Sequence, residues 1–419
     1  MKSNLNMPKH NIKSGFINHC QICGNKDIKA VLDLGYQPLA DDLKDTKSTN
    51  AGATFFPIEI GFCKKCILLQ NNYIVDDKSL YTKNYHYRPG ITKDVVNNFQ
   101  SMSQKLTKLY DLNSESIVAD IGCNDGSLLK QFRKLGIIKT VGIEPTDTIK
   151  YAKPKIKTVQ DFMNISSSKK ALKFYGKADL ITTTNVFAHT NNLKTFILGV
   201  KKLIKKNGIF VIENHYLGAI LKKKQFDSFY HEHLRTYSLL SLVRLMKYYG
   251  FRIINAYTTD RYGGNIQAHF SLGNLKKSHN VNKILDKELK DKLNKEMTYK
   301  KLKKDIENID YQISTFINQN KHKKIVAKAF PARASILVHR FSSIKNNISF
   351  VAEQPSSLKL NKYVPGTNIK IISSEKLKTF KPDIMIILAW HLFDTIHKKW
   401  KAKLKKTKFV KILPQFKVY

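Results

Sequence analysis

The chain has 419 residues, of which 42% are hydrophobic and 11% aromatic, which is enough for two or three globular domains and excludes an intrinsically disordered protein. The sequence has no apolar run long enough to span a bilayer, and no apolar stretch follows the first basic residues. We therefore expect a soluble, cytoplasmic protein with no membrane partner.

The formal net charge of +41 raises the question of a nucleic-acid partner. The 73 lysine and arginine residues are spread along the whole chain, which is typical of a compositional bias of the genome. Denser basic runs, at residues 300–304 and 398–408, lie in helical patterns where a solvated face is the ordinary interpretation. We expect no nucleic-acid partner, and a monomer or a weak dimer.

Four of the five cysteines form two Cys-x-x-Cys pairs, Cys20 with Cys23 and Cys63 with Cys66. In a chain without a secretory signal, such pairs indicate a metal site rather than disulfides. Two zinc knuckles supply four sulfurs and close a tetrahedral zinc site with no open position, so the predicted zinc is structural. The long loop between the pairs predicts an intervening hairpin or helix. Reduced cysteines that bind nothing are the alternative.

From residue 116 onward, apolar runs alternate with helical patterns. This order predicts an α/β fold with a doubly wound sheet, in which ligands bind at the carboxyl ends of the strands. A Lys/Glu/Asp-rich helical segment follows, and a second, smaller α/β unit with five strands completes the chain. The predicted strands of the first sheet are 117–123, 140–143, 157–160, 178–184, 208–212, 251–256 and 265–272, the last one antiparallel.

Polar residues at the predicted strand ends indicate a nucleoside site. Gly122 and Gly126 let a ligand approach the backbone of the first turn, and Glu144 can accept hydrogen bonds from both hydroxyls of a ribose. The turn lacks the G-x-G-x-x-G of dinucleotide sites, which favours a nucleoside without a pyrophosphate. The pattern resembles the S-adenosylmethionine site of class I methyltransferases. The predicted cofactor-binding residues are Asp120, Gly122, Asn124, Gly126, Glu144, Pro145, Asp161, Phe162 and Asn185.

The stretch Tyr230-His231-Glu232-His233 follows the fifth strand and places three groups able to move protons near neutral pH beside a phenol. We interpret it as a candidate acid/base centre; a polar cluster between domains is the alternative. His189 and His215, at two other strand ends, are candidates for substrate contacts or for structural roles. Residues 80–90, rich in aromatic and basic groups, form either a lid over a ligand or an interdomain packing segment.

From about Cys20 to its end, the chain resembles the sugar C-methyltransferases that act on nucleotide-activated 4-keto-deoxysugars. The residues that carry the resemblance are the two Cys-x-x-Cys pairs, Tyr230-His231-Glu232-His233, Tyr262-Gly263-Gly264, Tyr363-Val364-Pro365-Gly366 and Ile387-Leu388-Ala389-Trp390. Residues 328–335 and His391 depart from the family pattern, which leaves the exact sugar open.

The resemblance implies S-adenosylmethionine-dependent methylation of C-3 of a dTDP-4-keto-6-deoxyhexose, in which a base removes a proton next to the ketone. His233 is then the base, with Tyr230 and Glu232 as neighbours in the site and Tyr85 closing over the reacting centre. Glu232 would orient an imidazole, and Tyr230 or His231 would donate a hydrogen bond to the enolate oxygen.

The resemblance also implies a domain order: a loose tail (1–18), a zinc-binding module (19–80), a class I methyltransferase core (81–275), a helical linker (276–322) and a C-terminal α/β domain that contacts the substrate (323–419). Two alternatives remain open from the residues. One is a sugar O- or N-methyltransferase on the same fold, and the other is an RNA-modifying or RNA-binding zinc protein.

Overall fold

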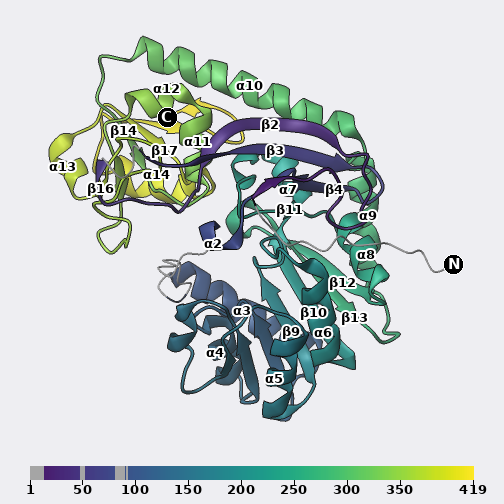
Figure 1. Ribbon diagram of the computed structural model, residues 1–419. Coiled ribbons are helices and arrows are strands. Elements are labelled where there is room, and N and C mark those ends of the chain that lie inside the picture. The colour runs from purple at the N-terminus through teal and green to yellow at the C-terminus, as the bar shows by residue number, and fades with distance from the viewer. Residues whose placement is uncertain (1–13, 48–51, 81–89, 91–92) are drawn as a thin grey trace.

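The computed structural model describes residues 14–47, 52–80, 90 and 93–419. Figure 1 shows two lobes: one is built on a seven-stranded sheet, and the other contains the C-terminal sheet and a long hairpin beneath helix α10. No helix in the described part of the chain combines the length and the apolar character that a membrane crossing needs.

The seven-stranded sheet confirms the predicted α/β doubly wound fold. Its order is β12-β13-β10-β9-β6-β7-β8, so the chain changes direction across the sheet between β6 and β9. Strand β13 is antiparallel to both of its neighbours, and the remaining pairs are parallel. The strands are β6 (Val118–Ile121), β7 (Thr140–Ile143), β8 (Lys157–Val159), β9 (Ala178–Thr184), β10 (Ile204–His215), β12 (Arg252–Thr259) and β13 (Asn265–Ser271).

Helices cover both faces of this sheet, which explains why its parallel strands read as continuous apolar runs. Apolar residues of α3 and α4 pack on one face, and those of α5, α6 and α8 on the other. The sequence sets helix starts locally: Ser238 accepts a hydrogen bond from the backbone of Ser241 in a capping box. The helices are α3 (Lys93–Leu109), α4 (Ser127–Lys134), α5 (Ile165–Tyr175), α6 (Leu193–Leu203) and α8 (Leu239–Tyr248).

A four-stranded sheet, in the order β11-β4-β3-β2, carries the cysteine pairs. The segment between the pairs forms the hairpin of β2 (Lys29–Pro38) and β3 (Phe55–Cys63), which confirms the predicted hairpin. Strand β4 (Leu68–Asn71) pairs with β11 (Arg235–Thr236), which directly follows the Tyr230–His233 stretch. Gly15–Phe16, within the expected tail, forms β1 and pairs with β5 (Tyr73–Ile74).

The C-terminal sheet has the order β16-β15-β14-β17-β18-β19. It contains the five predicted strands and a sixth, β19, which is antiparallel and was not predicted. Two short helices follow β14: α11 (Ala334–Arg340) and α12 (Ser342–Asn347). The strands are β14 (Ile325–Lys328), β15 (Val351–Glu353), β16 (Ile371–Ser373), β17 (Ile384–Ile387), β18 (Lys408–Lys411) and β19 (Lys417–Val418).

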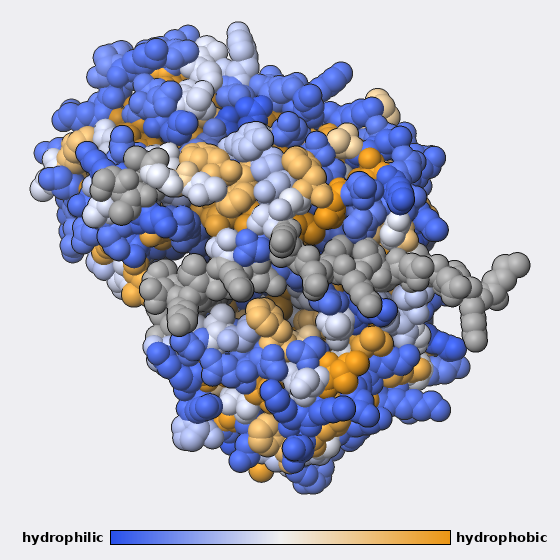
Figure 2. Space-filling model, in the orientation of Figure 1, coloured by the Kyte–Doolittle hydropathy of each residue, from blue (hydrophilic) through white to orange (hydrophobic). Residues whose placement is uncertain are grey.

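Two helices, α9 (His279–Lys290) and α10 (Glu296–Gln319), connect the seven-stranded sheet to the C-terminal sheet along the chain. Helix α10 exposes its lysines but buries an apolar stripe at helical spacing. This stripe shares one core with the β2–β3 hairpin and with the C-terminal sheet, and the rings of Phe62 and Tyr299 lie 4.8 Å apart in it. The stripe consists of Tyr299, Leu302, Ile306, Ile309, Ile313 and Ile317. Hydrophilic residues dominate the outer edges of both lobes in Figure 2.

Candidate functional site

The four paired cysteines meet in a buried metal-ligand cluster. The sulfur atoms of Cys20, Cys23, Cys63 and Cys66 all lie within 4.8 Å of one another, and none of the four forms a disulfide. Sγ of Cys23 and Sγ of Cys63 are 3.7 Å apart. A tetrahedral zinc site with Zn–S bonds of about 2.3 Å requires sulfur separations of about 3.8 Å. The cluster therefore fits a structural zinc ion.

The turn after β6 has the shape expected of a cofactor cradle. Gly122 and Gly126 adopt φ values of 71° and 73°. A Cβ on Gly122 would lie 2.3 Å from Cγ2 of Val186, so the turn needs glycine there. Buried Glu144 accepts hydrogen bonds from the Asn124 backbone N–H at 3.0 Å and from the Thr146 backbone N–H at 2.9 Å. The Thr146 hydroxyl donates a third hydrogen bond to Glu144 at 2.6 Å, so one of the roughly four acceptor positions of this carboxylate remains for a ribose.

The remaining predicted cofactor residues lie at the same edge of the sheet in different surroundings. Asp120 is buried behind the turn and accepts a hydrogen bond from the Thr182 hydroxyl at 2.7 Å. Burial raises the pKa of Asp120 to about 7. Four others follow β7, β8 and β9: Pro145 and Asp161 are half-buried, Phe162 is 53% exposed, and Asn185 accepts a hydrogen bond from Asn265 at 3.2 Å.

Two histidines from distant parts of the chain lie against His233. The ring of His189, after β9, and the ring of His215, at the end of β10, each have their centroid 4.8 Å from that of His233. The Tyr230 ring is 4.2 Å from the His233 ring, and Tyr262 lies 5.9 Å from His215. The Tyr230–His233 stretch thus lies at the carboxyl edge of the sheet, where a doubly wound fold binds its ligands.

The hydrogen bonds of His233 determine which nitrogen carries the proton. Nδ1 lies 2.8 Å from the carbonyl oxygen of Ser228, and because a carbonyl only accepts, Nδ1 is the donor. The lone pair of Nε2 then accepts a hydrogen bond from the Tyr230 hydroxyl, 3.0 Å away. Burial lowers the pKa of His233 well below 6.5, with further contributions from His215 and His189. His233 is therefore neutral near pH 7, with Nε2 as its basic atom.

The other two members of the stretch have different partners. Glu232 lies beside His189, with Oε2 3.8 Å from Nδ1, and burial raises the pKa of Glu232 to about 8. The imidazole next to Glu232 is therefore that of His189, while His233 is oriented by the Ser228 carbonyl. His231 donates from Nε2 to the carbonyl oxygen of Phe56 in β3 at 3.2 Å, which ties the stretch to the hairpin. Tyr85 lies outside the described residues.

The hairpin sheet also contacts the two ends of the stretch. The Asn71 side-chain amide donates to the Tyr230 carbonyl at 2.9 Å, and the Asn71 backbone N–H donates to the Leu234 carbonyl at 3.0 Å. Arg235 donates to the side chain of Gln21, between the first two cysteines, at 2.6 Å. The candidate base is therefore held on the same small sheet as the metal-ligand cluster.

Sequence reasoning missed a buried ionic cluster next to the candidate base. The carboxylate of Asp227 accepts hydrogen bonds from Arg333 Nε at 2.7 Å, from Arg333 Nη2 at 2.9 Å and from Trp390 Nε1 at 2.9 Å. The sequence carried one signal of it, since Arg333 falls in the segment 328–335 that departs from the family pattern. Nothing in the sequence linked that arginine to Asp227.

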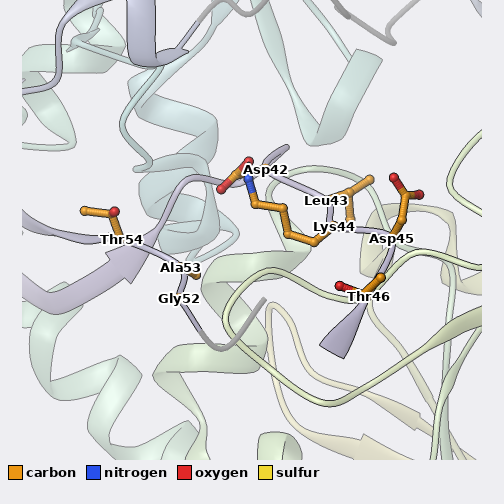
Figure 3. A pocket seen from close by; sticks show the side chains of 8 residues that line it. All are labelled: Asp42, Leu43, Lys44, Asp45, Thr46, Gly52, Ala53 and Thr54. Carbon is orange, nitrogen blue, oxygen red and sulfur yellow. Dashed lines mark hydrogen bonds and ion pairs between the residues drawn. The ribbon is translucent and has the colours of Figure 1, made fainter. Parts of the chain in front are cut away.

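A hollow among the described residues lies elsewhere (Figure 3). It measures about 490 Å³ and is lined by residues 42–46 and 52–54 of the β2–β3 loop. Within this loop Lys44 pairs with Asp42 at 2.6 Å, and its backbone forms an isolated bridge with Tyr363 of the C-terminal lobe. None of the predicted site residues lines this hollow, so its size carries no information about the chemistry.

Three family models match the chain in the order of its sheets. A "Putative zinc binding domain" matches residues 20–81, a "Methyltransferase domain" matches residues 96–256, and a "C-methyltransferase C-terminal domain" matches residues 260–414. The C-methyltransferase NovU of Streptomyces niveus is 27% identical over 388 residues, which cover 90% of each chain.

Solved structures resemble parts of the chain. A methyltransferase from Clostridium acetobutylicum is 14% identical and covers 43% of this chain and 92% of its own, with a TM-score of 0.34. A protein from Pyrococcus horikoshii is 12% identical and covers 46% of this chain and 99% of its own, with a TM-score of 0.35.

The sheet order, the glycine turn and the match to a methyltransferase domain define a class I, S-adenosylmethionine-dependent methyltransferase. With a zinc-binding domain and a C-methyltransferase C-terminal domain on either side of that core, the chain has the domain order of a C-methyltransferase and is similar to one over 90% of its length.

Proposed function

We propose that this protein transfers a methyl group from S-adenosylmethionine to a ring carbon next to the ketone of a nucleotide-linked ketosugar, C-3 of a dTDP-4-keto-6-deoxyhexose. The observation that carries the proposal is the state of His233. Its Nδ1–H is fixed on the Ser228 carbonyl, and its neutral Nε2 faces the Tyr230 hydroxyl. A buried, neutral imidazole with a fixed tautomer is suited to take a proton from carbon.

The reaction needs such a base because a carbon bound to hydrogen is not nucleophilic. When bound, S-adenosylmethionine supplies an electrophilic methyl group on a sulfonium. The proton on the carbon next to the ketone passes to Nε2 of His233, and the bonding pair becomes the enolate. That pair then forms the new carbon–carbon bond to the methyl group, while the sulfur keeps the electrons of the broken bond. The imidazolium finally returns its proton to solvent.

Tyr230 has a second task in this sequence. Its hydroxyl lies on Nε2 in the structure, and a substrate ketone offers it a competing acceptor. By turning to the ketone oxygen, the hydroxyl frees the lone pair of Nε2 and stabilises the developing enolate. The base and the enolate donor thus stand three residues apart in the sequence and in ring contact in the fold.

The first experiment incubates the protein with labelled S-adenosylmethionine and a thymidine-diphospho-4-keto-6-deoxyhexose. Mass spectrometry and NMR then locate the methyl group. Methyl on C-3 is the expected product; methyl on oxygen or nitrogen would favour the sugar O- or N-methyltransferase instead.

A second experiment isolates the proton transfer. In D2O, with S-adenosylhomocysteine in place of the methyl donor, the enzyme should exchange the hydrogen on C-3, and His233→Asn should lose this exchange. Asparagine can still donate to the Ser228 carbonyl but offers no base. The exposed His322 gives a matched control, because His322→Asn leaves the cluster untouched. Exchange by His233→Asn at the parent rate would refute His233 as the base.

A further inference from the structure

The carboxylate of Asp227 joins the two lobes at a fully buried point. Asp227 is 0% exposed and comes from the short 3-10 helix η3 (Phe226–Ser228) of the methyltransferase lobe. Its three described donors all come from the C-terminal lobe: two nitrogens of Arg333, before α11, and the indole N–H of Trp390, after β17. The planar guanidinium fork matches both carboxylate oxygens, which fixes the orientation of the pair as well as its distance.

Asp227 immediately precedes the residue that orients the candidate base. Ser228 is the last residue of η3, and its carbonyl accepts the Nδ1–H of His233 at 2.8 Å. Arg333 also donates to the side chain of Gln225 at 3.2 Å, and the Gln225 carbonyl accepts the Ser228 backbone N–H at 3.0 Å. The guanidinium therefore contacts both sides of the turn from which the Ser228 carbonyl projects.

We propose that Arg333 and Trp390 of the C-terminal lobe are positioning residues for His233, acting through Asp227 and the Ser228 carbonyl. The proposal rests on the proposed function for the identity of the base. Each connection is one hydrogen bond or one peptide unit long. If the Ser228 carbonyl turns away, Nδ1 loses its hydrogen-bond acceptor. The tautomer with hydrogen on Nε2 then gains population, and in that tautomer Nε2 has no lone pair with which to take a proton.

The alternative is that the cluster only holds the two lobes together. Both roles predict lower stability when the cluster is cut, because an uncompensated buried carboxylate is costly. Only the positioning role predicts a change at the His233 ring in protein that is still folded. The tautomer of His233 is therefore the measurement that separates them.

Two variants cut the cluster differently. Trp390→Phe removes one neutral donor, keeps an aromatic ring and leaves every charge in place. Arg333→Lys keeps the positive charge but replaces the two-pronged fork by a single point. Arg340→Lys is the matched control, since Arg340 lies in α11 and pairs with Asp310 at 2.8 Å, away from Asp227.

The experiment records 15N-histidine NMR spectra of each folded full-length variant, the kcat for methyl transfer and the affinity for S-adenosylmethionine. In the parent, His233 should show hydrogen on Nδ1 alone. In Trp390→Phe and Arg333→Lys, we expect part of His233 to carry hydrogen on Nε2, and kcat to fall on the order of tenfold or more. Affinity for S-adenosylmethionine should stay unchanged, and Arg340→Lys should match the parent throughout.

The pH profile provides a further readout. The Ser228 hydrogen bond favours the protonated imidazole and therefore offsets part of the lowering of the His233 pKa that burial causes. Trp390→Phe changes no charge, so a weaker Ser228 hydrogen bond should lower the pKa of His233 further. The fall of kcat/KM on the acid side of the pH profile should then occur at lower pH.

An unchanged tautomer and acid limb in both folded variants would overturn the positioning role, whatever happens to stability. Failure of the proposed function is a separate result: the parent would then transfer no methyl to the ketosugar, while the tautomer measurements would still test the coupling of Arg333 to His233.

Discussion

The Tyr230 hydroxyl lies 3.0 Å from Nε2 of His233, on the one atom of that ring able to accept a proton. The structure therefore shows the candidate base with its lone pair covered by a donor that a ketone can attract. We expect Tyr230→Phe to lower kcat about 10²–10³-fold, the usual loss when one donor to an enolate or oxyanion is removed. Steady-state kinetics will check this. Tyr311→Phe, at a phenol 73% exposed in α10, should have no effect.

At acidic pH, protonation of His233 should limit the proton-transfer step. Because burial keeps the pKa of His233 well below 6.5, its neutral form persists at pH 6 and disappears only at lower pH. The rate of hydrogen exchange at C-3 should therefore stay constant from pH 8 to below pH 6.5 and fall as pH drops further. A fall that begins at pH 7 or above would show that His233 is not buried and neutral during the reaction.

Glu144 should control the affinity for the methyl donor. Glu144→Gln removes a buried charge and an acceptor at the end of β7, and hydrogen bonds to charged groups contribute about 1.5–3 kcal/mol. We expect binding of S-adenosylmethionine to weaken about 10–100-fold in isothermal titration. Glu115 supplies the comparison, because its exposed carboxylate pairs with Lys139 at the opposite edge of the sheet, and Glu115→Gln should bind like the parent.

Zinc should hold the candidate base as well as the cysteine knuckles. The protein should contain one zinc per chain, and Cys23→Ser should lose it, whereas Cys123→Ala, at the fifth cysteine, should retain it. Because β11 pairs with β4 in the four-stranded sheet that carries the cysteine pairs, metal loss should also raise the rate of amide hydrogen exchange across residues 230–236. Unchanged exchange there in zinc-free protein would contradict this coupling.

Glu232 makes stability depend on pH. Its pKa is raised to about 8 from 4.5, so the stability tied to its neutral form is present below pH 4.5 and is lost as pH rises through 8. Each pKa unit corresponds to about 1.4 kcal/mol. Glu232→Gln avoids this loss, so its Tm relative to the parent should rise between pH 5 and pH 9. Glu307→Gln, at an exposed carboxylate of α10, should show no such trend.

Local patterns in the sequence predicted the sheet and the positions at its edge. Buried strands such as β6 and β9 are nearly all apolar, and polar residues follow the strands of this sheet directly, so Glu144 was predicted from its position along the chain. The cysteine spacing predicted the metal-ligand cluster for the same reason. These features depend on neighbours within a few residues, which a single sequence displays. His233 was named as the base from the family resemblance.

Contacts between distant segments were not predictable in this way. Strand β11 has only two residues, and its partner β4 lies more than 160 residues earlier, so no periodicity marks the pairing. Asp227 and Arg333 are 106 residues apart, and each alone resembles an ordinary charged residue. Helix α10 was expected as a solvated linker because its lysines dominate the composition, although its apolar stripe lies in the same core as the β2–β3 hairpin.

That shared core bears on how such enzymes can be recombined. Apolar residues of the β2–β3 hairpin, of α10 and of the C-terminal sheet pack together in one core. The methyltransferase core separates the hairpin from the other two in the chain. A chimera that exchanges only the C-terminal segment with a relative would set foreign side chains against the native hairpin, and overpacked or hollow cores cost several kcal/mol. Exchanging the C-terminal sheet between relatives therefore requires moving two non-adjacent stretches of the gene together, with the segment between them left in place.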